Sequence, residues 1–196
     1  TAFGALSSAQ ITALTTAQVE QITTAQLTSM KSGQMAGLTS SQIDAFNTTQ
    51  VAALGSAQAA GLTTAQIVGL ATADLTALST AAVSGLGTAA INALTTDQIG
   101  ALGTQQIAAI KTSQITALST DQIVAISTTQ AAVLSSAQVA SLKTAQIAAM
   151  QTAGVAKLTT AALSSMTTAQ IQALGTGQVA ALQTNQVNAL TSAQVA

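Results

Sequence analysis

The chain lacks six residue types altogether: cysteine, histidine, arginine, tryptophan, tyrosine and proline. Without cysteine there is no disulfide, no thiolate nucleophile and no zinc–thiolate site. Without histidine, a serine or threonine nucleophile has lost its commonest activating base. Without arginine, bidentate contacts to phosphate or guanine are unavailable. We therefore expect no enzyme, with no catalytic residue, no bound metal and no cofactor.

Charge is also scarce. Lys and Arg total 4 and Asp and Glu total 5, which gives a net charge of −1. This balance provides no electrostatic footprint for nucleic acid or for an anionic membrane surface. Hydrophobic residues make up 48% of the chain, yet no apolar run approaches the roughly 18 residues of a membrane helix. We expect neither nucleic-acid binding nor membrane insertion.

What the chain does have is a strict period of eight. From Leu6 to Leu190 a large apolar residue opens each of 24 octads, with no insertion or deletion. The consensus is Leu-Thr-Thr-Ala-Gln-Ile-Ala-Ala. Residues Leu62 to Gly69 differ from it only at the last two positions. A fixed short period indicates one small unit stacked along an axis. We therefore interpret residues 1–196 as a single continuous array without a domain boundary.

The eight positions, numbered from Leu6 as position one, differ in how much they vary. Position one is always Leu, Ile, Met or Phe, position three is Ser or Thr in all 24 octads, and position six is almost always aliphatic. Position five is Gln in 19 of 24; the exceptions are Asp74, Ala82, Ala90, Gly154 and Ala162. Nearly all charges fall at positions two, four and seven. Because charges seek water, these three positions are predicted to face out, and positions one, five, six and eight to face in.

A single long helix does not fit this period. Eight residues at about 100° each leave an offset of about 80° per octad, so the apolar stripe would wind around the helix. A short helix within each octad does fit. Thr63 to Gln66 reads as a capping box, a hydroxyl N-cap followed by Gln three residues later. The sequence predicts an all-α solenoid of short capped helices, and leaves open whether position two or position three is the cap.

A β-solenoid is the alternative. Positions one, three and five alternate with variable positions, as a strand would, and would form internal hydroxyl and glutamine ladders. Abundant alanine and the lack of a regular Gly, Asn or Asp at the corners favour the helical solenoid.

A few charged residues are candidates for chemistry. Asp97 and Asp121 share position four, three octads apart, and would lie close if three octads complete one turn. Such a carboxylate pair could bind Ca²⁺ or transfer protons, but isolated surface charges are the simpler interpretation. Asp74 replaces Gln at an inward position, where we expect it to find hydrogen-bond partners. Lys157, at position eight, is expected to extend its ammonium group to solvent.

The octad resembles the Leu-Thr-x-x-Gln-Ile/Leu arrays of long bacterial surface and secreted proteins, often described as adhesin-like. It is also similar to the Leu-Thr-Pro-Glu-Gln-Leu phrase that starts helices, with Ser or Thr here in place of Pro. The resemblance covers the whole chain and implies a repetitive extracellular or cell-surface scaffold; it assigns no catalytic residue.

The expected function is accordingly structural: a fibre, sheath or adhesive stalk whose partner is itself. Both ends fall within a repeat, and no basic n-region of a signal peptide precedes Phe3. We expect a longer array or an end-to-end filament, since solenoids otherwise carry polar caps. The alternative is a binding module, in which the Ser and Thr columns engage a glycan, a host surface or ice.

Overall fold

Residues 2–195 are described by a computed structural model, and they form 24 short α-helices preceded by the 3₁₀ helix η1. Each α-helix has four to six residues and occupies one octad, and no strand occurs among the residues described. The prediction of an all-α solenoid is therefore confirmed, and the β-solenoid alternative is wrong. The segments between the helices of residues 2–195 are short turns and bends.

The chain divides into two compact units, residues 1–102 and 103–196, although the octad register continues through the boundary without change. The elements of the first unit are η1 (Ala2–Ala5), α1 (Ser8–Thr12), α2 (Thr16–Glu20), α3 (Thr24–Thr28), α4 (Ser32–Ala36), α5 (Ser40–Asp44), α6 (Thr48–Ala52), α7 (Ser56–Ala59), α8 (Thr64–Gly69), α9 (Thr72–Ala77), α10 (Thr80–Gly85), α11 (Thr88–Ala93) and α12 (Thr96–Ala101).

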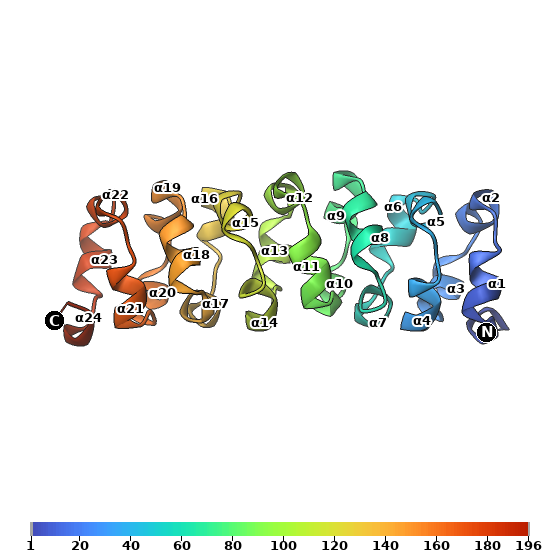
Figure 1. The fold of residues 1–196 in the computed structure, drawn as a ribbon, viewed down its shortest axis with the longest axis horizontal. Helices are drawn as coiled ribbons and strands as arrows, with labels where there is room; N and C mark the ends of the chain where they lie inside the picture. Colours follow the sequence, from blue (N-terminus) through green and yellow to red (C-terminus); the bar gives the residue numbers. More distant parts are fainter. Residues whose placement is uncertain (1, 196) are drawn as a thin grey trace. The chain divides into compact units, whose positions relative to one another are not determined.

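The second unit repeats the same plan (Figure 1). Its helices are α13 (Thr104–Ala108), α14 (Thr112–Ile115), α15 (Thr120–Val124), α16 (Thr128–Ala131), α17 (Ser136–Ser141), α18 (Thr144–Ala149), α19 (Thr152–Val155), α20 (Thr160–Ser164), α21 (Thr168–Gln172), α22 (Thr176–Ala180), α23 (Thr184–Asn188) and α24 (Ser192–Val195).

Within each unit a helix packs against the helix three octads later. In the first unit α1 contacts α4, α4 contacts α7 and α7 contacts α10, and the series beginning at α2 and α3 behave in the same way. The second unit shows the same pairing, from α13 with α16 to α21 with α24. Three octads, or 24 residues, therefore make one turn of the solenoid, and each unit has three columns of stacked helices.

The change of direction between helices uses ordinary backbone conformations. Where a six-residue helix ends, the position-one residue is extended, as Leu70 is with φ −61° and ψ 129°. The N-cap at position two is extended as well, as in Thr63 before α8 with φ −80° and ψ 163°. No cis peptide and no positive φ occurs along residues 2–195. Any L-residue can adopt these angles, which explains why the corners need no regular glycine or proline.

Positions one, five and six supply the core of the solenoid, as predicted. Ile67 at position six is 0% exposed, Leu70 at position one is 4% exposed, and Gln66 at position five is 2% exposed. Positions two, four and seven are exposed in most octads, also as predicted. A helix of one and a half turns does not persist alone in water. The buried core within each unit therefore keeps the helices formed.

Position eight lies at the rim rather than in the core, which refines the prediction that it faces in. Its residues are mostly half-buried and pack against the backbone of position three, one turn earlier in the same column. Ser165 Oγ, for example, donates to the carbonyl of Ser136 at 3.0 Å. A Cβ added to Gly85 would come within 2.5 Å of the Cα and carbonyl oxygen of Ser56. The close approach of the two backbones explains why position eight is mostly Ala, Gly or Ser.

This packing predicts opposite effects for two glycine-to-alanine substitutions in the same region. A Cβ at Gly61, a position-eight residue, would overlap the carbonyl oxygen of Ser32, so Gly61→Ala should lower the free energy of unfolding by about 1–3 kcal/mol. Gly33, inside α4, has nothing within 4 Å of an added Cβ, so Gly33→Ala should raise it by about 0.5–1 kcal/mol. Urea denaturation followed by circular dichroism would measure both, and equal effects would contradict the packing described.

Candidate functional site: the glutamine contacts between turns

Position two is the N-cap of each helix, which decides between the two alternatives left open by the sequence. Thr63 is extended and precedes α8, its Oγ1 accepts the backbone N–H of Gln66 at 3.3 Å, and its own N–H donates to Gln66 Oε1 at 2.7 Å. This reciprocal pair is a capping box. Position three is the first residue of the helix.

The hydrogen bond from the N-cap N–H to the Gln side chain forms even where position two has no capping side chain. The N–H of Lys31 donates to Gln34 Oε1 at 2.7 Å, and that of Gly103 donates to Gln106 Oε1 at 2.8 Å. Neither Lys31 nor Gly103 makes a side-chain cap hydrogen bond. Because Gln covers the N-cap N–H independently, position two can vary freely.

The Nε2 group of the same carboxamide donates hydrogen bonds to the preceding turn. Gln50 Nε2 donates to the carbonyl oxygens of Ile22 at 2.7 Å and Val19 at 3.1 Å. Gln170 Nε2 does the same in the second unit, to Leu142 at 2.7 Å and Val139 at 3.1 Å. The acceptors lie 28 and 31 residues earlier, in the linker after a helix and near the end of that helix. The carbonyl of Val19 also accepts the N–H of Ile22 at 3.1 Å. One side chain thus caps the start of its own helix and the end of another.

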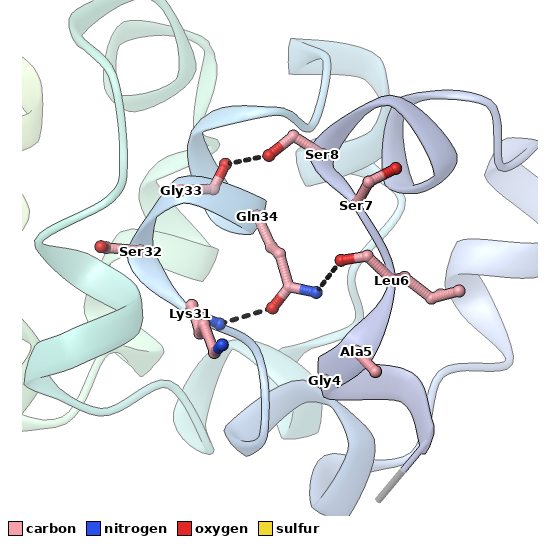
Figure 2. Close-up of a pocket in the computed structure, with 9 residues that line it drawn as sticks. All are labelled: Gly4, Ala5, Leu6, Ser7, Ser8, Lys31, Ser32, Gly33 and Gln34. Carbon is pink, nitrogen blue, oxygen red and sulfur yellow. Dashed lines mark hydrogen bonds between the residues drawn. The ribbon is translucent and has the colours of Figure 1, made fainter.

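Figure 2 shows this arrangement near the start of the chain, where Gln34 lies between the N–H of Lys31 and the carbonyl of Leu6. The distances are 2.7 Å on both sides. Ser8 Oγ adds a parallel contact by donating to the carbonyl of Gly33 at 2.9 Å. The bonds from Gln34 to Leu6 and from Ser8 to Gly33 join segments of successive turns, 28 and 25 residues apart.

The chemistry of the contact explains why position five is Gln and not a similar residue. A capping box accepts Glu as well as Gln, but a carboxylate has no N–H to donate to the carbonyls of the preceding turn. Sequence reasoning identified the box and missed the contact between turns. The available signal was that Glu never replaces Gln at this position.

Where Gln is missing, a neighbour in the same octad can replace its donor. In the octad of Ala82, Ser79 Oγ donates to the carbonyl of Leu54 at 3.0 Å, the acceptor that a Gln at 82 would reach. In the octad of Gly154, Gln151 Nε2 donates to the carbonyl of Val124 at 2.7 Å. Both replacements come from position two.

The charged residues singled out from the sequence lie in four different octads. Asp97 lies in α12 of the first unit and Asp121 in α15 of the second; both are exposed, and their pairing stays a prediction. Lys157 is exposed, as expected. No group of three or more Asp or Glu side chains is placed to hold a metal ion among residues 2–195.

Asp74 is the exception among the charged residues because it is half-buried. It is the third residue of α9, and its N-cap, Ala71, has no capping side chain. Burial raises the pKa of Asp74 above its ordinary value, and the negative charge of Asp44 raises it further. The side chain is therefore at a position where its negative charge is unfavourable.

A surface pocket of about 430 Å³ lies beside the contact in Figure 2 and is lined by Leu6, Ser7, Ser8, Lys31 and their neighbours. Its backbone polar groups are largely taken up by the hydrogen bonds of the fold. Lys31 supplies its only charged side chain.

The hydroxyl at position three behaves differently from the rest of the octad. It is exposed in most octads, as in Thr16, Thr64 and Thr88, and position two already provides the cap. Thr168 Oγ1 donates to the carbonyl of Ala193 at 2.9 Å, but the described contacts give position three no role common to all octads. Nothing in the fold explains why Ser or Thr is invariant there.

Comparison with known proteins identifies the repeat. A family model described as the ALTTAQ repeat matches residues 35–72, 67–104, 100–128, 107–144 and 147–184, about three quarters of the chain. The six letters correspond to position eight followed by positions one to five. No curated protein matches the chain. None of the helices in residues 2–195 is long and apolar enough to cross a membrane.

The contact between turns predicts that Gln50→Glu will be much more damaging than Gln26→Glu. Gln50 is 3% exposed and donates to the carbonyls of Ile22 and Val19. The substitution keeps the capping box but turns a carboxylate toward those oxygens, and should cost about 2–4 kcal/mol of unfolding free energy at neutral pH.

Gln26 is the matched control. It forms the same box with Thr23, whose N–H donates to Gln26 Oε1 at 2.9 Å, but within residues 2–195 its Nε2 has no acceptor in a preceding turn. Gln26→Glu should change the unfolding free energy by less than about 0.5 kcal/mol. Equal losses in denaturant titrations of the two variants would show that only the box matters.

Proposed function

The chain belongs to the ALTTAQ repeat family. From its repeated contacts and its weakly charged surface, we propose that it is a structural extracellular protein. In this proposal the repetitive solenoid forms a fibre, sheath or adhesive stalk by associating with further copies of itself. It acts as a scaffold, without catalysis and without a cofactor. The observation that carries the proposal is the same glutamine contact repeated from turn to turn within each unit.

The contact supports a scaffold because it joins successive turns along the solenoid. A turn with three glutamines donates three carboxamides to the turn before it, as α4, α5 and α6 do through Gln34, Gln42 and Gln50. In a solenoid, stability grows by adding such nearest-neighbour interfaces. A rod of any length can be assembled from one kind of interface.

The outer surface supports lateral association. Positions two, four and seven are exposed and carry mostly Ser, Thr, Ala and Gly, with Val68 and Val124 as exposed as 47% and 44%. With 9 charged side chains in 196 residues, little electrostatic repulsion keeps neighbouring solenoids apart. The absence of cysteine suits a repetitive protein in an oxidising, extracellular compartment, because no wrong cross-link can form.

The proposal is tested by adding charge to the exposed surface without touching the core. Ala65, Ala89, Ala145 and Ala169 are exposed residues at position four, where Asp97 and Asp121 already occur and where a negative charge suits the first turn of a helix. Replacing all four by Asp should leave the circular dichroism unchanged and prevent self-association.

The native chain should form fibres or bundles in electron micrographs and sediment as large species at moderate salt. The fourfold Asp variant should stay dispersed, and the matched fourfold Ser variant should assemble like the native chain. A native chain that remains monomeric at every concentration tested would count against a self-assembling scaffold.

A second candidate, a binding module, is favoured by the exposed hydroxyls of position three. Thr64 and Thr88 lie in α8 and α11, which stack in one column of the first unit. If such columns bind a glycan or an ice surface, Thr16→Ala, Thr64→Ala and Thr88→Ala together should reduce that binding while preserving the fold. Glycan arrays and ice-recrystallisation assays with no signal from the native chain would remove this candidate.

A further inference from the structure

The glutamine contacts are interrupted over one complete turn. Asp74, Ala82 and Ala90 replace Gln in three successive octads, and three octads make a turn. The interface between the turn α6–α8 and the turn α9–α11, called here the glutamine-free joint, therefore lacks the carboxamide donor in all three columns. The other gap, at Gly154 and Ala162, affects only two of three columns and includes the Gln151 replacement.

Two columns of the joint compensate by closer packing. Between α7 and α10, Ala82 is 0% exposed, Gly85 lies against the backbone of Ser56, and Ser79 Oγ donates to the carbonyl of Leu54. Between α8 and α11, Ala90 is 3% exposed. The helices α7, α8, α10 and α11 carry no charged side chain.

The third column, between α6 and α9, contains Asp74. Gln50 and Gln42 reach the carbonyls 28, 30 and 31 residues before them. The same register from position 74 leads to the carbonyls of Ile43, Asp44 and Phe46, at the end of α5 and in the linker to α6. A carboxylate cannot donate to these oxygens, whereas a protonated carboxyl can.

We propose that the glutamine-free joint is a proton-controlled latch, closed when Asp74 is protonated and loosened when it is ionised. The protonated carboxyl takes the place of the missing carboxamide and donates one hydrogen bond to a carbonyl at the end of α5. Because Asp is one methylene shorter than Gln, α9 moves toward these carbonyls as the bond forms. Ionisation releases the proton to solvent. The Asp74 carboxylate then faces a backbone carbonyl oxygen with no hydrogen bond between them.

The charges around Asp74 favour the same direction. Asp44 at the end of α5 is close enough to act on it, α12 contributes the exposed Asp97, and α6 carries no charged residue. Lysine is absent from α5, α6, α9 and α12. No positive group therefore stabilises the ionised form from these elements.

The sign of the pH dependence follows from linkage. Burial and Asp44 raise the pKa of Asp74 in the folded chain, and the hydrogen bond proposed for the closed joint favours the protonated form further. The extra stability of the closed joint is complete below the ordinary pKa of an aspartate and is lost as the pH rises through the raised value. Each unit of difference in pKa between the closed and open joint corresponds to about tenfold in the opening equilibrium.

Hydrogen exchange measured by mass spectrometry tests the latch in the intact chain. After correction for intrinsic exchange rates, protection of residues 71–93 should rise several-fold when the pH falls from about 7 to about 4. Protection of residues 168–188 should not follow this change, because Gln170, Gln178 and Gln186 hold that segment.

Three variants separate the latch from a general effect of acid. Asp74→Asn, which donates at every pH, should give the protected behaviour at both pH values, and Asp74→Gln should equal or exceed it. Asp97→Asn, which removes an exposed carboxylate of the same column, should keep the native pH dependence. A native chain whose joint does not respond to pH, or an Asp74→Asn variant that responds as the native chain does, would overturn the proposal.

Discussion

The structure depends on a carboxamide that makes hydrogen bonds at both of its ends. Helices of four to six residues are too short to be stable in isolation, because the first turn costs more than it returns. Their exposed backbone groups are correspondingly numerous. Gln at position five accepts from the N-cap of its own helix and donates to the end of a helix one turn earlier, as Gln50 does. Local capping and stacking of turns are therefore one interaction.

The remaining positions of the octad are adjusted to the distance that this interaction sets. Positions one and six fill the core with aliphatic side chains, and position eight stays small because it meets the backbone of position three. Close-packed interiors tolerate little change in volume. Where Gln is lost, in the turn α9–α11, closer contact and Ser79 replace it, so the solenoid has more than one way to join turns.

Much of this could be predicted from the period alone. The eight-residue repeat excluded one long helix, the capping box at Thr63–Gln66 located the helix starts, and the charged positions marked the outside. The contact between turns could not be predicted, because its partners lie 28 to 31 residues apart and nothing in one octad fixes the number of octads per turn. The cap was ambiguous because position two includes poor caps such as Lys31 and Lys143, whereas position three is always Ser or Thr. The N–H groups of Lys31 and Lys143 are covered by Gln instead.

The helices start from an N-cap at position two, and Ser79 and Gln151, which replace a missing Gln, come from the same octad as that Gln. Adding or removing one octad would change which helices stack on each other but not the kind of contact they make. Gene duplications and deletions in multiples of 24 base pairs would thus produce longer or shorter arrays that fold as before. The length of the array could then change by whole octads while the kind of contact between turns is kept.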